Sequence, residues 1–185
     1  MTNRLFLTTI ALVSLMSGCA TLSETECISG NWEQIGYQDG KSGRDKDYIL
    51  NHESACIEYN VELDRLAYEQ GRQDGLERYC TSSNGYNRGV RGSHPNLSCH
   101  SHQFPQYYDG LYQGFVVRFD DIQHELSEAH KEHDILSEVY RRVEDDEEKQ
   151  RIDNELDDLD QDISSLQREL QKVDDLINRY RPYHQ

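Results

Sequence analysis

Two segments of the chain carry an unbroken pattern of apolar residues in which steps of three and four alternate. The first runs from Phe115 to Val143 and the second from Ile152 to Tyr180. Such a pattern marks one helix face that packs against another helix in coiled-coil fashion. The nine-residue gap between Val143 and Ile152 breaks the phase and predicts a turn. We therefore expect an antiparallel hairpin of two helices, each about 43 Å long at 1.5 Å per residue.

Local signals place the ends of this hairpin. Asp145, with Glu148 three residues later, is typical of a helix cap and an acidic first turn, which the helix dipole favours. Pro105 suits a first helical position, so the first long helix is expected to start near Phe104. The turn contains neither glycine nor proline, which leaves one alternative open: a single continuous helix paired in a parallel dimer.

The first half of the chain repeats a small glycine cassette, Gly36 to Gly40 and again Gly71 to Gly75, with looser copies near Gly85 and Gly110. Glycines four residues apart place two bare patches on one helix face, where a second helix backbone can approach closely. Asn31 and Asp64 are expected to cap two helices that carry the full cassettes. We expect a shorter helix over 51–59 and a loop over 80–102, which is punctuated by glycine, serine and proline. The predicted fold is mainly α: a disulfide-stapled Gly/Tyr-rich helical globule followed by the hairpin.

The N-terminus has the form of an export signal. A cationic start precedes an apolar run from Leu5 to Met16, which is too short for a lasting span of about 20 residues. Residues 15–19 resemble the lipobox of bacterial lipoproteins, which implies removal of residues 1–18 and lipidation of Cys19. Ordinary cleavage after Ala20 is the alternative. Several acyl chains anchor a protein without spanning the bilayer. Ala20, by resemblance to Gram-negative lipoproteins, implies sorting to the outer membrane, facing the periplasm.

Four cysteines remain after Cys19 is set aside: Cys27, Cys56, Cys80 and Cys99. An even number in an exported chain predicts two disulfides, and three pairings are possible. We prefer Cys27 with Cys56 and Cys80 with Cys99, because short sequential loops close most easily. A metal site formed by Cys99 with three nearby histidines is the alternative, although the paired Cys-x-x-Cys of structural zinc sites is missing. Those weak candidates are His94, His100 and His102.

Charge narrows the range of partners. The formal net charge is −16, and it becomes −17 once residues 1–18 are removed, because they carry only Arg4. Residues 121–180 hold 20 acidic and 8 basic side chains, a net of −12. This balance disfavours nucleic acid and anionic headgroups as partners. Within the hairpin, His124, His130 and His133 could respond to pH or metal, but solvated histidines without such a duty are commoner.

A series of cysteines, glycines and other residues runs in a recognisable order through the first half of the chain. These residues are Cys27, Trp32, Ile35, Gly36, Asp39, Gly40, Gly43, Cys56, Tyr68, Gly71, Gly75, Tyr79, Cys80, Gly85, Gly89, Gly92 and Cys99. Together they resemble a bacterial lipoprotein family catalogued as domain of unknown function 2799. The resemblance spans Cys27 to Gly114, with a charged helical tail behind it, and the family supplies no established activity. Where the family often has small residues or proline around the last cysteine, this chain has histidines.

The expected domains are a signal peptide (1–18), a lipidated tether (19–26), the Cys/Gly/Tyr-rich domain (27–103), the hairpin (104–180) and a tail (181–185). No catalytic motif and no cofactor signature is found. Asp39, Asp74 and Asp109 recur at one cassette position, which favours a structural role over an acid pair with separated pKa values.

Two non-enzymatic functions are considered. A glycan-binding module is suggested by Trp32 and by nine of twelve tyrosines that lie between Tyr37 and Tyr112, although such rings also build small cores. Our preferred hypothesis is a structural or protein-interaction lipoprotein of the cell envelope. The N-terminal lipid would attach it to the membrane, and the acidic hairpin would bind a partner protein.

Overall fold

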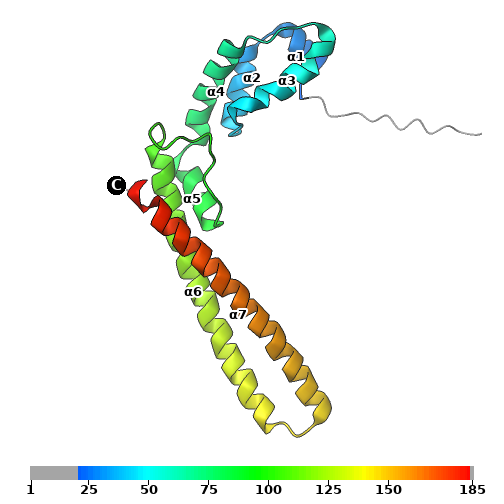
Figure 1. Cartoon of the computed structure of the whole chain (residues 1–185), viewed down its shortest axis with the longest axis vertical. Helices are drawn as coiled ribbons and strands as arrows, with labels where there is room; N and C mark the ends of the chain where they lie inside the picture. The colour runs from blue at the N-terminus through cyan, green and yellow to red at the C-terminus, as the bar shows by residue number, and fades with distance from the viewer. Residues whose placement is uncertain (1–20, 184–185) are drawn as a thin grey trace, which may run out of the picture.

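The computed structural model describes residues 21–183 and forms an elongated, helical molecule (Figure 1). Helices α1 to α4 form one end, α5 and the start of α6 lie in the middle, and the hairpin of α6 and α7 extends away from them. No β-strand occurs within residues 21–183. The elements are α1 (Glu24–Ser29), α2 (Trp32–Lys41), η1 (Lys46–Tyr48), α3 (Ile49–Cys56), η2 (Ile57–Tyr59), α4 (Arg65–Tyr79), α5 (Ser82–Val90), α6 (Pro105–Arg142), α7 (Asp146–Tyr180) and η3 (Arg181–Tyr183).

In the first unit, α2 and α4 run parallel with their backbones in direct contact. A Cβ atom at Gly36 would lie 1.9 Å from the carbonyl oxygen of Tyr68, and one at Gly71 would lie 1.8 Å from that of Glu33. Gly40 and Gly75 make the equivalent approach one turn further along. The glycine faces of the two helices therefore pack against each other. This confirms the close backbone approach that the glycine cassettes predicted. Asn31 and Asp64 cap the two helices, also as predicted.

A second unit repeats this arrangement with α5 and α6. A Cβ at Gly85 would lie 1.9 Å from the carbonyl oxygen of Tyr107, and one at Gly110 would lie 2.0 Å from that of Ser82. The loop predicted over 80–102 is therefore wrong in its first half, where residues 82–90 form a helix. Thr81 caps α5, and contact with α6 offsets the helix cost of two glycines.

The two units share one spacing of residues, which indicates an internal duplication. Gly36, Gly40 and Gly43 correspond to Gly85, Gly89 and Gly92, and the last glycine of each set has positive φ. Tyr68, Gly71 and Gly75 correspond in the same way to Tyr107, Gly110 and Gly114. Tyr68 and Tyr107 are both fully buried. The repeating element is thus a pair of helices, which comparison of the short cassettes alone missed.

Each unit contains one disulfide, Cys27–Cys56 in the first and Cys80–Cys99 in the second. This is the sequential pairing that the sequence analysis preferred. All four cysteines are fully buried. Each bond links a cysteine just before the first helix of a parallel pair to a cysteine in the crossover that leads to the second helix. In the chain-entropy model a disulfide of this kind contributes about 3 kcal/mol.

The hairpin is antiparallel and joined by a short turn at 143–145, so the parallel-dimer alternative is wrong. The side chain of Asp145 accepts a hydrogen bond from the backbone N–H of Glu148 at 2.8 Å, the predicted cap. Helix α6 has 38 residues and α7 has 35, which correspond to about 57 and 52 Å. Both exceed the expected length, because each helix continues beyond the apolar pattern. The start of α6 also belongs to the second unit.

Two hydrophobic cores stabilise the molecule. One lies in the first unit around Trp32, Ile49 and Tyr68, and it includes Leu22. The other runs from Leu76 through the second unit into the hairpin, where Ile122 and Ile163 are buried. Within residues 19–26, where a tether was expected, Leu22 is buried and α1 begins at Glu24.

Candidate functional site

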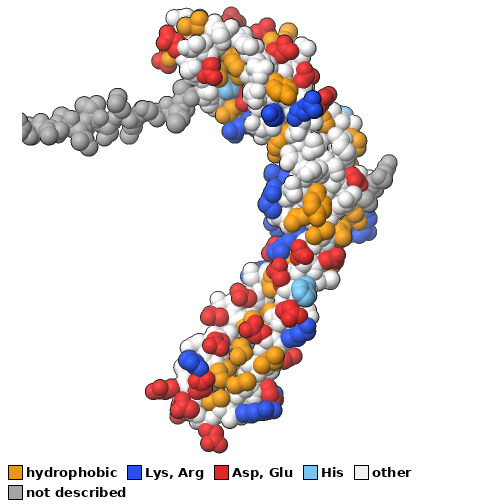
Figure 2. Space-filling view, turned by 180° about the vertical axis from the view of Figure 1, so that it is seen from behind, with side chains coloured by type: hydrophobic (Ala, Val, Ile, Leu, Met, Phe, Trp, Pro, Cys, Tyr) orange, Lys and Arg blue, Asp and Glu red, His pale blue; other side chains and the backbone are white. Residues whose placement is uncertain are grey.

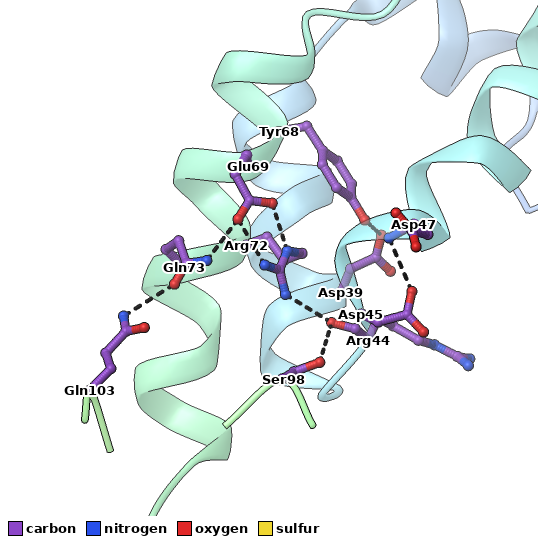
Figure 3. Close-up of polar contacts among 10 residues, drawn as sticks. All are labelled: Asp39, Arg44, Asp45, Asp47, Tyr68, Glu69, Arg72, Gln73, Ser98 and Gln103. Carbon is purple, nitrogen blue, oxygen red and sulfur yellow. Dashed lines mark hydrogen bonds and ion pairs between the residues drawn. The ribbon is translucent and has the colours of Figure 1, made fainter. Parts of the chain in front are cut away.

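A buried polar cluster lies between three helices of the first unit. Asp39 from α2 accepts a hydrogen bond from the hydroxyl of Tyr68 on α4, with 2.8 Å between the oxygens. The same carboxylate oxygen lies 2.7 Å from Nε2 of His52 on α3. His52 is only 3 % exposed, and its Nδ1 lies 2.9 Å from the hydroxyl oxygen of Thr21. Figure 3 shows Tyr68 pointing toward Asp39.

The surroundings of Tyr68 keep its phenol protonated. Burial, and then the hydrogen bond to Asp39, raises the pKa of Tyr68 far above its usual value of 10. The phenol therefore stays a donor throughout the neutral range. A carboxylate beside Nε2 favours the tautomer with its proton on that nitrogen, which leaves Nδ1 to accept from Thr21.

Thr21, His52 and Asp39 stand in the order hydroxyl, imidazole and carboxylate, which is the order of a hydrolase triad. Their surroundings do not support that chemistry. His52 is almost completely enclosed, and four surface hollows of about 290–400 Å³ are lined by other residues. A triad needs space beside the nucleophile for a substrate and oxyanion donors. The geometry instead holds the start of the chain onto α3.

A second polar cluster surrounds the buried guanidinium of Arg72 on α4. Arg72 is 4 % exposed, and its Nε and Nη2 donate to the two carboxylate oxygens of Glu69, each at 2.7 Å. These hydrogen bonds hold the pKa of Glu69 below its usual value. Nη1 donates to the carbonyl of Arg44, which also accepts from the hydroxyl of Ser98 (Figure 3). The cluster therefore ties α4 to the segment after α5.

Asn96 completes this junction between the two units. Its side-chain amide donates to the carbonyl of Gly43 at 2.9 Å and to the hydroxyl of Tyr79 at 3.2 Å. Its backbone N–H donates to the hydroxyl of Tyr107 at 3.0 Å. One residue thus contacts the turn after α2, the end of α4 and the start of α6. No pattern in the sequence singled it out.

The three cassette acids do not converge. Asp39 is half-buried in the first cluster, whereas Asp74 is exposed beside a hollow that also includes Tyr37. Asp109 lies in the second unit, where it accepts a hydrogen bond from Gln113. The equal positions of these acids in the cassettes therefore do not give them equal environments, and no acid pair is formed by them.

The histidine candidates for a metal site are likewise dispersed. The rings of His100 and His102 are stacked with centroids 5.8 Å apart, while His94 lines a hollow beside α7. Cys99 is held in a disulfide and offers no thiolate. Across residues 21–183 no group of three or more histidine, cysteine or acidic side chains could hold a metal ion. In the hairpin, Nε2 of His133 lies 3.5 Å from Asp160.

Most aromatic rings of the first half serve the cores. Tyr68 and Tyr107 are fully buried, and Trp32 is 5 % exposed. Each of the four surface hollows includes at most one tyrosine. Sugar stacking needs exposed rings along one groove, so this arrangement favours the core role.

The expected signal peptide and the expected lipidation site, Cys19, lie outside the described residues. Within residues 21–183 there is no helix with the length and apolarity that crossing a membrane requires.

Comparison with known proteins finds a family match. The model of the family described as Protein of unknown function (DUF2799) matches residues 31–115, from the cap of α2 to the end of the glycine contacts on α6. The match covers the helix pairs of both units and stops before the free part of the hairpin. No curated protein and no solved structure matches the chain. Through residues 31–115, the chain is therefore similar to the DUF2799 family of proteins of unknown function.

Proposed function

We propose that this chain is a lipoprotein of the bacterial cell envelope with a structural or protein-interaction role. Lipid on Cys19 would hold it on the outer membrane, facing the periplasm. The observation that carries the proposal is the arrangement of the molecule: the chain enters the first unit at one end, and the acidic hairpin extends from the other (Figure 1). Such a molecule can present a surface far from its anchor.

The start of the chain supports a close anchor. The contact of Thr21 with His52 and the burial of Leu22 fix the chain at its entry into the first unit. Cys19 precedes Thr21 by two residues in the sequence, and two residues of chain span at most about 7 Å. Acyl chains on Cys19 would therefore bring the first unit against the bilayer surface.

The disulfides support a location outside the cytoplasm. Both bonds are buried and hold the crossovers of the two units, so the fold uses all four later cysteines in oxidised form. Disulfides of this structural kind persist in oxidising compartments such as the periplasm.

Mass spectrometry of the native protein tests the anchor. We expect an acylated N-terminal Cys19, and we expect the protein to fractionate with membranes, whereas Cys19→Ser releases it into the soluble fraction. Cys80→Ser with Cys99→Ser is the matched control, because it removes cysteines without touching the anchor. An unacylated N-terminus beginning after Ala20 would contradict the proposal.

Crosslinking in intact cells tests the interaction role. A photoreactive residue is placed in turn at Asp120 and Asp157 on the outer face of the hairpin and at Glu132 and Glu155 on one side of its seam. We expect at least one position to give a discrete adduct with another envelope protein. A full set of positions without any adduct above that of the unmodified chain would count against this role.

A further inference from the structure

One side of the hairpin seam brings like charges together. Near the second unit, Arg118 on α6 binds Glu169 on α7, with 2.9 Å between Nη2 and the carboxylate. In an antiparallel pair, each step of seven residues along α6 toward the turn is matched by seven residues back along α7. The next layers are then Glu125 with Asp162 and Glu132 with Glu155. We call these four residues the acidic flank.

The acidic flank is not neutralised within the described chain beyond its first residue. Glu125 contacts Arg118 at 3.1 Å. Glu132, Glu155 and Asp162 are exposed and form no hydrogen bond or ion pair with another residue of 21–183. Facing like charges reduce the stability of a helical pair. The opposite side of the seam differs, because there Gln123, His130 and Ser137 of α6 face α7.

Apolar side chains lie beside the acidic flank near the turn. Ile135 is 64 % exposed and Val139 is 41 % exposed, and they lie one helical turn apart on the same side of α6 as Glu132. The neighbouring seam residues Leu136 and Leu156 are only half-buried. Figure 2 shows hydrophobic side chains lying among acidic ones over the hairpin. A contiguous apolar and acidic surface therefore remains open to solvent.

From this arrangement we infer that the acidic flank, with Ile135 and Val139, is the docking surface for a cationic amphipathic helix of a partner protein. Lysine or arginine side chains would neutralise the facing carboxylates, and apolar side chains would cover Ile135, Val139 and the half-buried seam. This is the mode in which a helix lies in a groove formed by other helices. A second copy of this chain fits poorly, because it would bring another strongly acidic hairpin to the same place. The inference deepens the interaction role proposed above and rests on it.

Peptide binding to the mature chain, with Cys19→Ser and both disulfides intact, tests the surface. The probe is a fluorescent helical peptide of about 18 residues with lysines on one face and leucines on the other. Its controls are a scrambled peptide of the same composition and an analogue with glutamate in place of lysine. We expect the amphipathic probe to bind, and both controls to bind at least roughly tenfold more weakly.

Matched variants locate the site. Glu132→Lys with Glu155→Lys is expected to weaken binding at least about tenfold, whereas Asp120→Lys with Asp157→Lys, which changes the net charge equally, is expected to weaken it less than about threefold. Ile135→Ser with Val139→Ser is expected to weaken binding about fivefold or more without changing the helix content. Equal losses for both lysine pairs, or no loss for the serine pair, would overturn the inference.

A stability measurement guards against misfolded variants. Glu132→Gln with Glu155→Gln removes the facing charges, so we expect it to raise Tm by on the order of 2 °C while weakening peptide binding. Asp120→Asn with Asp157→Asn should change neither Tm nor the affinity for the peptide. A dimer in light scattering that Ile135→Ser with Val139→Ser dissolves would assign the surface to self-association instead. Adducts from Asp120 or Asp157, but none from Glu132 or Glu155, would keep the proposed function and reject this surface.

Discussion

At the scale of single residues, burial decides which of several similar side chains forms hydrogen bonds that hold helices together. Asp39, Asp74 and Asp109 occupy equivalent cassette positions, but only Asp39 accepts hydrogen bonds from both a buried tyrosine and a buried histidine. Across residues 21–183 no buried side-chain nitrogen or oxygen lacks a hydrogen-bond partner. A satisfied polar network of this kind favours one arrangement of the surrounding helices.

Tyr68 makes the folded state sensitive to alkaline pH. Burial and Asp39 raise the pKa of Tyr68, so the unfolded chain loses this proton near pH 10 while the folded chain keeps it. The unfolded state then binds fewer protons, and the free energy of unfolding falls as pH rises above about 10. Thermal denaturation at pH 8 to 11 should show a Tm that is level up to about pH 10 and falls above it. The stability conferred by the neutral phenol is fully present below pH 10.

The matching variant is Tyr68→Phe. Because the hydrogen bond to Asp39 is lost, this variant should have a free energy of unfolding about 1–3 kcal/mol lower at neutral pH, and therefore a lower Tm. The fall of Tm above pH 10 should also become less steep. Part of the decline should remain, because burial also raises the pKa of Tyr107 and Tyr108. Tyr86→Phe, at a 37 % exposed position, serves as the control. A decline of unchanged steepness in Tyr68→Phe would contradict this account.

At the scale of elements, the glycine-bearing helix pairs are the characteristic feature of the fold. Parallel helices whose backbones touch cannot accept a side chain at the contact, and this explains why eight glycines line the two pairs. The sequence spacing predicted close helix approach, but it did not specify partners. The repeated cassette marked the contact glycines of α2 and α4, but residues 82–90 were assigned to a loop, because serine, asparagine and glycine have low helix propensity.

Gly36→Ala tests the close approach. In a free helix this change is stabilising by about 1 kcal/mol, but here the new Cβ would meet the backbone of Tyr68 at 1.9 Å. We therefore expect a net loss of about 1–3 kcal/mol, read from urea unfolding of the mature chain. Gln38→Ala, exposed on the same helix, should stay within about 0.5 kcal/mol of the parent. A stabilised Gly36→Ala variant would show that the helices do not touch.

At the scale of the whole molecule, two cores are joined by polar contacts through the segment that follows α5. Asn96 reaches the turn of the first unit and two tyrosines, while Ser98 and Arg72 share the carbonyl of Arg44. The disulfide Cys80–Cys99 holds this segment in place. The direction of the hairpin relative to the first unit therefore depends on these hydrogen bonds together with the packing of Leu76 from α4 in the second core.

Asn96→Ala should loosen this junction. We expect a lower free energy of unfolding by about 1–3 kcal/mol. We also expect a broader distribution of distances between spin labels at exposed sites on α2 and on the hairpin, measured by pulsed electron paramagnetic resonance. Leu97→Ala, a neighbouring position that is 83 % exposed, should leave both quantities unchanged. An equally narrow distribution in Asn96→Ala would show that other contacts set the angle between the units.

Taken alone, the sequence determined α2, α4 and the two hairpin helices, the caps Asn31, Asp64 and Asp145, the turn of the hairpin and the faces on which glycine or apolar residues lie. These features follow from helical periodicity and from hydrogen bonds between residues a few positions apart, so a short window of sequence contains them. Only the tertiary structure decided that the glycine helices pair in parallel, that the pair is duplicated, that Asp39 meets His52 and Tyr68, and that Asn96 joins the units. Those outcomes depend on contacts between residues 11 to 53 positions apart, whose register no local pattern specifies.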